Sequence, residues 1–169
     1  QNYLQALWDH AIVTGLGTRR LAVAARVDSG DAFIAGLLHD TGKLILLVAF
    51  DQFDNRPGTA PLSGVARAEL MQSLHCELGH KVLHDWLIPE PVCRVALHHH
   101  DPADEGDRMM TCVRAANAMS RRLGAHPDPE PELSLVELPE FGELDLGELE
   151  IDTLMVDVQE DLAQLRALI

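Results

Sequence analysis

The sequence predicts an all-α fold built around one substantial core. Apolar residues recur at steps of three and four along several segments, which is the spacing that places them on one face of a helix. Polar stretches containing proline and glycine separate these segments and are typical of turns and loops. The chain has 169 residues, of which 47% are hydrophobic, and is therefore long enough for one domain with a sizeable interior.

The first third of the chain contains three predicted helices. Apolar spacing that begins at Leu4 predicts a helix over residues 2–26. The turn at residues 28–31 offers an N-cap for a second helix, which ends at His39. A short apolar helix is expected to follow over residues 43–50.

Four further helices are predicted beyond a loop at residues 51–63. Pro89 and Pro91 interrupt the pattern, and Pro91 suits the first turn of a helix. A polar loop is expected at residues 101–107. The four helices cover residues 64–74, 75–86, 91–99 and 109–123.

Composition divides the chain into three parts. Residues 1–125 form the predicted helical core, residues 126–148 an acidic connection rich in proline and glutamate, and residues 149–169 a C-terminal helix. Apolar residues in that last helix alternate steps of four and three, which allows either a short coiled-coil seam or docking on the core. Because so few heptads are present, we expect docking.

The net charge of −14 is concentrated near the C-terminus. Residues 123–169 hold 13 of the 27 acidic residues and one basic residue, Arg166, whereas residues 1–122 are nearly neutral. No stripe of basic residues stands out, which argues against a nucleic-acid-binding face. We expect the acidic region to be solvated or to face a protein partner.

Hydropathy and cysteine content favour a cytoplasmic protein that does not enter a membrane. The longest apolar stretch, residues 44–50, is far shorter than a membrane span. Cys76, Cys93 and Cys112 lie among apolar neighbours. Because the cysteines are few and odd in number, we expect reduced core thiols rather than disulfides.

His39 and Asp40 form the strongest functional signal in the sequence. They end a helix in which every residue from 32 to 38 is apolar or glycine, so that helix should lie in the core without a solvent face. A buried imidazole and a buried carboxylate are costly unless each is hydrogen-bonded, charge-paired or bound to a metal. The pair therefore requires partners.

Helical geometry separates the remaining histidines into inward-facing and outward-facing sets. His75 shares the apolar face of its helix, and His99 aligns with apolar residues of the next helix. The outward-facing set is His80, His84 and His98, and no role is expected for His126 in the acidic connection. The inward-facing set, completed by the His-Asp pair, is His10, His39, Asp40, His75, His99 and His100.

Five inward histidines and one aspartate, carried by helices that must pack together, suggest a metal site. Imidazole and carboxylate ligands suit iron, manganese, zinc or nickel. With Asp40 as a bridge, two ions would polarise a phosphate and lower the pKa of a shared water. Spacing alone leaves open whether the side chains converge, and a core of hydrogen-bonded histidines is the alternative.

Five short motifs follow one another along the chain. They are Leu7-Trp8-Asp9-His10, Gly36-Leu37-Leu38-His39-Asp40-Thr41-Gly42-Lys43, His75-Cys76-Glu77-Leu78-Gly79, Trp86-Leu87-Ile88-Pro89 and His99-His100-Asp101-Pro102. In this order they resemble HDOD domains, the bacterial relatives of the HD and HD-GYP phosphohydrolases. The likeness covers the later part of such a domain and implies an HD-like helical bundle with a role in signal transduction.

The same resemblance implies ligands for one or two divalent cations. HD proteins use a histidine, the His-Asp pair and a later aspartate, and HD-GYP enzymes add a His-x-x-x-Gly histidine and a His-His pair. At the matching positions, the implied ligands are His10, His39, Asp40, His75, His99 and His100. Asp40 and Lys43 are the implied catalytic residues, because that lysine lies near the site in the family and can meet a substrate phosphate.

Three departures from the family pattern weigh against catalysis. Arg114 or Asn117 stands where the final aspartate is expected. Residues 102–106 replace a Gly-Tyr-Pro segment, and Ala6 replaces a glutamate found in some HD-GYP enzymes. The lost ligand leaves an open position on a first ion. Alternatively, the Arg114 guanidinium would pair with Asp40 and replace a cation.

We therefore expect a regulatory HDOD-like module that binds a divalent metal or a ligand and acts through signalling partners. The alternative is a metal-dependent phosphohydrolase acting on a nucleotide, a cyclic dinucleotide or another phosphoester. The near-intact ligand set favours the enzyme, whereas the missing final aspartate favours the regulatory module.

Overall fold

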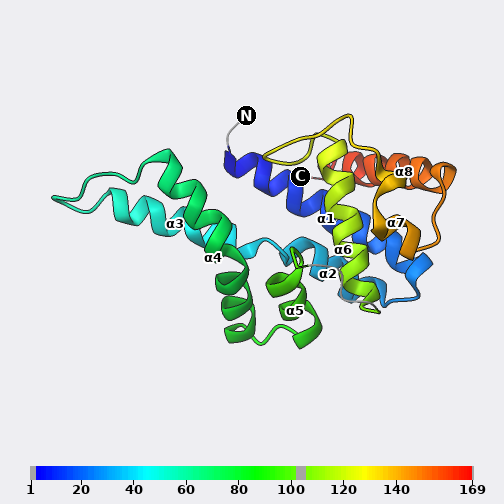
Figure 1. Ribbon diagram of the computed structural model, residues 1–169, viewed down its shortest axis with the longest axis horizontal. Coiled ribbons are helices and arrows are strands. Elements are labelled where there is room, and N and C mark those ends of the chain that lie inside the picture. The colour runs from blue at the N-terminus through cyan, green and yellow to red at the C-terminus, as the bar shows by residue number, and fades with distance from the viewer. Residues whose placement is uncertain (1–2, 102–105, 169) are drawn as a thin grey trace.

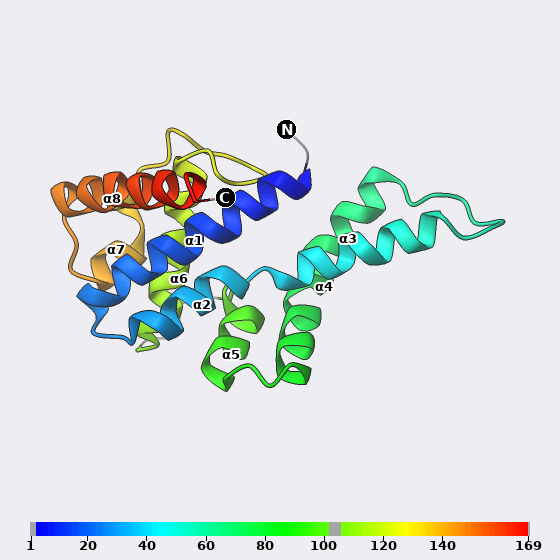
Figure 2. The same cartoon turned by 180° about the vertical axis from the view of Figure 1, so that it is seen from behind.

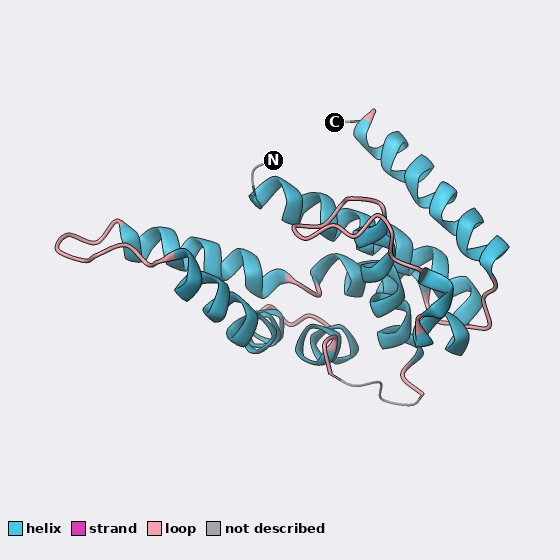
Figure 3. Ribbon diagram, turned by 45° about the horizontal axis from the view of Figure 1, so that its top comes forward, coloured by secondary structure: helices cyan, strands magenta, loops and turns pink. Residues whose placement is uncertain are grey.

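The computed structural model describes residues 3–101 and 106–168, and the regular elements in these ranges are helices (Figure 1). The predicted all-α fold is therefore confirmed, as Figure 3 also shows. Asn2, Ile169 and residues 102–105 of the expected polar loop lie outside the described residues. The elements are α1 (Tyr3–Ala25), α2 (Ser29–Leu38), α3 (Thr41–Asp54), α4 (Gly64–Asp85), α5 (Glu90–His98), α6 (Arg108–Arg122), the 3-10 helix η1 (Leu135–Glu137), α7 (Pro139–Glu143) and α8 (Glu148–Arg166).

α1 is the central helix of a bundle that it forms with α2, α6 and α8. Every residue from Ile12 to Thr18 is buried, because the three other helices cover α1 from different sides. Leu21 of α1 and Met119 of α6 belong to one apolar cluster at the centre of this bundle. α5 and α8 lie on opposite sides of α1 (Figures 1 and 2).

Small residues allow α2 and α6 to approach α1 closely. A methyl group on Gly36 would lie 2.4 Å from Oγ1 of Thr18, so α2 has no room for a side chain at this position. A methyl group on Gly17 would lie 3.1 Å from Cβ of Ala116 on α6. Interiors packed at this density tolerate few added atoms. The close contacts place the C-terminal end of α2 beside α1.

α3 and α4 form a helical hairpin that projects away from the bundle (Figure 1). An ion pair between Asp54 and Arg67 closes the base of the loop at residues 55–63. The backbone N–H of Leu62 donates to the Asp54 carboxylate as well, at 2.9 Å. α5 then packs against α4 and α2, which connects the hairpin to the bundle.

Two predicted helix boundaries were wrong. α4 is one continuous helix rather than two, because no glycine or proline interrupts residues 65–78. α3 continues to Asp54 instead of ending at Phe50. The N-cap expected at the turn before α2 is confirmed, since the Asp28 side chain accepts hydrogen bonds from two backbone N–H groups.

The acidic connection contributes to the core. It contains η1 and α7, and its Leu135, Phe141 and Leu144 side chains are buried in the same apolar cluster as α1 and α6. Arg121 of α6 forms an ion pair with Glu130, which holds the start of the connection against α6. Its apolar residues were too irregularly spaced to predict this packing.

One segment meets the length and hydropathy criteria of a membrane-spanning helix. Within Gly30–Asp54, an 18-residue window has a mean hydropathy of 1.6, and 44% of this window is buried inside the protein. The expectation from the sequence rested only on the longest uninterrupted apolar stretch and therefore missed this segment, which His39 and Asp40 interrupt. In the structure the same pair separates α2 from α3. Length and composition are weak indications here, since a buried core helix passes the same test.

Ion pairs and apolar contacts hold α8 across α1. Arg20 binds Asp161 through two N–H···O bonds of 2.8 Å, and Arg19 adds a bond of 3.1 Å to the same carboxylate. The bond from Arg20 lowers the pKa of Asp161 below its ordinary value. Ile151 and Val158 of α8 are buried, so the face of α8 that carries them packs against the bundle.

We predict that the ion pair between Arg20 and Asp161 stops stabilising the fold when the pH is lowered. Folding lowers the pKa of Asp161. Its ionised carboxylate therefore adds its full share to the free energy of unfolding above the ordinary carboxylate pKa, and this share is lost as the pH falls through the pKa of Asp161 in the folded protein. Asp161→Asn should cost up to about 1 kcal/mol at neutral pH and progressively less at acidic pH. Urea unfolding across this pH range measures the difference, with exposed Asp152→Asn as the control. A cost that does not depend on pH would contradict the prediction.

The contact between α3 and α4 generates a second prediction. A methyl group on Gly42 would lie 1.8 Å from the carbonyl oxygen of His75 and 2.8 Å from the nitrogen of Gly79. Gly42→Ala must therefore separate the two helices, and we expect a loss of about 2 kcal/mol or more. Gly64→Ala is the matched control, because a methyl group there meets nothing within 4 Å. Equal free energies of unfolding for the two variants would refute this account.

Candidate metal centre

Five buried side chains meet where the α3–α4 hairpin joins the bundle. Their exposed fractions lie between 0% for His10 and 6% for Asp40. They come from α1, from the junction of α2 and α3, from α4 and from the residue that follows α5. The structure thus brings together five of the predicted ligands, namely His10, His39, Asp40, His75 and His99.

The carboxylate of Asp40 lies among the four imidazoles. Its Oδ2 is 3.3 Å from Nε2 of His10 and 3.5 Å from Nε2 of His39. Its Oδ1 is 3.4 Å from Nε2 of His99 and 3.7 Å from Nε2 of His75. Among the residues described, neither this Oδ1 nor Nε2 of His99 has a hydrogen-bond partner. Each carboxylate oxygen therefore faces two imidazole nitrogens.

Backbone carbonyls hold the opposite nitrogen of three of these rings. A carbonyl oxygen only accepts, so Nδ1 carries a hydrogen, and in the neutral ring Nε2 then keeps its lone pair. A metal-binding histidine commonly has this arrangement, with Nδ1 hydrogen-bonded and Nε2 free for the ion. The three bonds join Nδ1 of His39 to the carbonyl of Gly36 at 2.7 Å, Nδ1 of His75 to that of Met71 at 2.7 Å, and Nδ1 of His99 to that of Ala96 at 3.1 Å.

A serine hydroxyl fixes the tautomer of His10 in the same way. Oγ of Ser120 lies 2.8 Å from Nδ1 of His10 and donates its own hydrogen to the carbonyl of Asn117 at 2.7 Å. The hydroxyl must then accept from His10, whose Nε2 lies 3.1 Å from Nε2 of His39. Two lone pairs at this distance repel unless a proton or a cation lies with them. The donor set therefore fits a cation.

The centre combines an ionised carboxylate with imidazoles, of which His39 and His75 are kept neutral by burial. Burial works to raise the pKa of Asp40, but the neighbouring imidazoles, His39 foremost, and the Lys43 ammonium hold it well below its ordinary value. Burial lowers the pKa of His39 strongly and that of His75 as well, against the attraction of Asp40. Metal ligands must be deprotonated, and this protonation state supplies such ligands.

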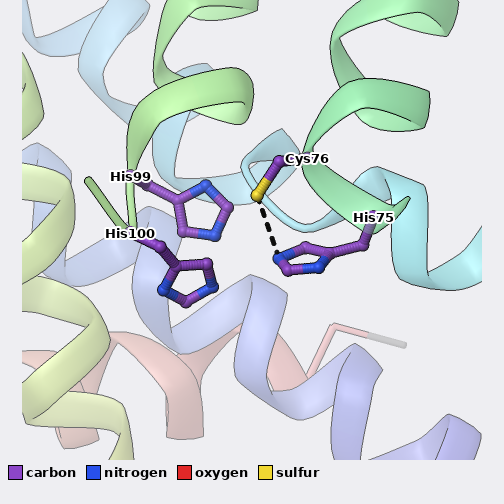
Figure 4. Close-up of side chains that lie close together, drawn as sticks. All are labelled: His75, Cys76, His99 and His100. Carbon is purple, nitrogen blue, oxygen red and sulfur yellow. Dashed lines mark hydrogen bonds between the residues drawn. The ribbon is translucent and has the colours of Figure 1, made fainter. Parts of the chain in front are cut away.

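The ligand atoms form two groups, and within each group they lie no more than 4.8 Å apart. The groups are His10, His39 and Asp40 and, at the edge of the centre, His75, Cys76, His99 and His100 (Figure 4). His100 was expected to face inward but is exposed. Its ring centroid lies 4.0 Å from that of His99, so it borders the centre from the solvent side.

Cys76 is a neighbour of the centre that the sequence analysis assigned to the core. It is half-buried, and its Sγ lies 3.2 Å from Nε2 of His75. Burial and the charge of Asp40 raise the pKa of Cys76 to about 11, so the side chain is a thiol. Its position directly after His75 was the signal that could have identified it. Cys93 and Cys112 are buried, as expected.

The cation that pairs with Asp40 is Lys43, not Arg114. Nζ of Lys43 lies 2.6 Å from Oδ2 of Asp40. Arg114 donates instead to the backbone carbonyls of His98 and His99, which lie at the C-terminal end of α5. The hypothesis of an Arg114–Asp40 pair was therefore wrong, because the guanidinium binds carbonyls at the end of a helix instead.

His126 also borders the centre, and Asn117 has a buried amide oxygen without a partner in the described residues. His126 was expected to have no role, yet its ring packs edge-on against His10 with centroids 4.6 Å apart, and burial lowers its pKa to about 4. The return of the acidic connection toward α1 could not be inferred from local sequence. Asn117 stands at one of the two positions expected for the final aspartate. Its Oδ1 is buried and has no hydrogen-bond partner in the described part of the chain.

An open cavity of about 660 Å³ borders the centre. His75 and His100 line it, together with the cationic side chains of Lys43 and Arg67 and apolar residues of α3 and α4 such as Phe50. Pockets that combine apolar walls with a few charged groups are typical of small-molecule sites. Both cations are already paired, Lys43 with Asp40 and Arg67 with Asp54, and the Asp128 carboxylate lines the cavity as well.

Comparison with known proteins places this geometry in a family. The crystal structure of an HDOD domain protein of unknown function from Geobacter sulfurreducens has a similar fold, with a TM-score of 0.66 and 18% sequence identity. The similarity covers 96% of this chain and 61% of that chain, so this chain spans about three fifths of the length of its structural neighbour. No protein of curated function matches the sequence. The family model of the HDOD domain matches residues 1–102, more than half of the chain, and the protein therefore belongs to the HDOD family.

Proposed function

We propose that this protein is a regulatory HDOD module that holds one or two divalent cations around Asp40 and acts through a signalling partner or a bound ligand. The orientation of the four imidazoles carries the proposal. Each directs its Nε2 toward one carboxylate while a separate group contacts its Nδ1, so that each neutral ring offers a lone pair there. Histidines that served only to satisfy a buried carboxylate would direct N–H groups toward it.

The ligands favour a transition metal of intermediate softness. Imidazole nitrogen and carboxylate oxygen together suit iron, manganese, zinc or nickel. Asp40 would be shared by two positions, because its two oxygens face different pairs of imidazoles. The first position is held by His10, His39 and Asp40, and the second by His75, His99 and His100.

The missing final aspartate favours regulation over turnover. Arg114 is bound to carbonyl groups of α5, and the amide of Asn117 carries no charge, so the first position has three strong protein ligands. Such a site keeps an open position for a ligand but lacks one carboxylate of the HD pattern. The acidic C-terminal region, residues 123–169, supplies a strongly negative surface for a partner.

Metal content tests the proposal directly. Elemental analysis by mass spectrometry on protein purified without an affinity tag or a chelator should find a stoichiometric divalent metal. The His39→Ala/Asp40→Ala variant should lose it, because it removes two ligands of the first position and the shared carboxylate. His98→Ala is the matched control, since that side chain is 45% exposed and pairs with Asp101 rather than with the centre. Wild-type protein that is metal-free and resists reconstitution would refute the proposal.

A metal-dependent phosphohydrolase is the second candidate, and the cavity beside the centre favours it. Lys43 donates a hydrogen bond to Asp40 and also lines this cavity, so it could contact a phosphate bound there. Arg67 lines the same cavity, where it is paired with Asp54. Bound divalent ions would polarise such a phosphate and lower the pKa of a water molecule.

Turnover assays separate the two candidates. We expect metal-loaded protein to leave chromogenic phosphomonoesters and phosphodiesters unhydrolysed, because the final carboxylate of the HD pattern is absent. Turnover that requires the metal, is lost in Lys43→Ala and is retained in Lys81→Ala would instead establish the hydrolase. Lys81 is a suitable control because its side chain is 73% exposed and pairs with Asp85.

A further inference from the structure

Cys76 brings a different ligand chemistry to the edge of the centre. Its Sγ lies within 4.8 Å of ligand atoms of His75, His99 and His100. Figure 4 shows these four side chains lying close together. The ligand pattern of HD and HD-GYP proteins does not include this position. The four side chains come from neighbouring points on two helices, with His75 and Cys76 adjacent in α4 and the two other histidines just beyond α5.

The hydrogen bonding of this group is incomplete in a way that a cation would remedy. Nδ1 of His75 donates to the Met71 carbonyl, so its Nε2 can only accept, and the Cys76 thiol is its donor at 3.2 Å. Nε2 of His99 is buried and, in the residues described, has no partner at all. A buried polar atom without a partner is costly and calls for an unrecorded ligand or water.

A cation at this point would satisfy both lone pairs and bind the sulfur. The S–H bond of Cys76 would break, its proton would pass to solvent, and the sulfur would keep the electron pair that forms the bond to the metal. No oxidant or reductant is needed. The result is a set of three imidazole nitrogens and one thiolate beside the Asp40 oxygen that both positions share, and all of these are ligand types that zinc binds in proteins.

We propose that Cys76 is a metal ligand and that the second position is a zinc site of His75, Cys76, His99 and His100. This inference rests on the proposed function, because it concerns one of the two metal positions. The first position offers nitrogen and oxygen ligands, whereas the second includes a thiolate, which selects zinc over harder ions such as manganese. The two positions therefore differ in the metal that they prefer.

Cobalt substitution tests the sulfur ligand without an activity assay. Co²⁺ added to metal-depleted wild-type protein should produce a thiolate-to-cobalt charge-transfer band in the near ultraviolet. Cys76→Ser should abolish this band, while the visible bands of cobalt at the first position persist. Cys112→Ala is the control, because Cys112 is buried in the apolar cluster of α6, away from the centre. Zn²⁺ affinity should fall in Cys76→Ser by more than the roughly 10- to 100-fold lost when only a supporting hydrogen bond is removed.

Protection from alkylation provides a test that needs no variant. Iodoacetamide should modify Cys76 in metal-depleted wild-type protein and should modify it at least tenfold more slowly after addition of Zn²⁺, as mapped by peptide mass spectrometry. Cobalt that binds without a charge-transfer band, or Zn²⁺ that leaves Cys76 equally reactive, would overturn this inference alone. Failure of wild-type protein to bind either metal would overturn the proposed function itself.

Discussion

The buried carboxylate of Asp40 is the constraint on which the rest of the structure depends. An ion removed from water costs several kcal/mol unless the protein surrounds it with partners. Those partners come from α1, α4 and α5, so these helices must all approach the junction of α2 and α3. Gly36 and Gly42 permit the approach, because each lies where a methyl group would overlap a neighbouring helix.

The balance of charge explains why this centre differs from an ordinary polar core. Lys43 neutralises the carboxylate at 2.6 Å, and that bond alone would satisfy one of its oxygens. The imidazoles donate from Nδ1 to the carbonyl groups and to Ser120, so in the neutral rings the Nε2 atoms that face Asp40 are acceptors. A group of acceptors around an anion is stable only with additional positive charge, which the proposed cation would supply.

Helical spacing was sufficient to predict the fold class and four of the five inward-facing histidines, because both depend on which face of a helix a residue occupies, but it placed the exposed His100 inward as well. The direction of long side chains was not predictable in this way. Arg114 binds carbonyl groups at the end of α5, and that end is brought to it by packing between distant segments. His126 reaches His10 for a similar reason, since a connection with no regular pattern folds back to α1. The pairing of Cys76 with His75 depends on rotamers that spacing does not determine.

The α3–α4 hairpin gives the centre a mechanical reach that a compact bundle would lack. α3 has 14 residues and is therefore about 21 Å long, and it begins directly after Asp40. His75 on α4 and His10 on α1 stand on the two sides of this joint. A rotation of the hairpin about this joint would displace the loop at residues 55–63 more than any residue near the centre. The centre thus lies at the pivot of the hairpin, and the loop lies at its far end.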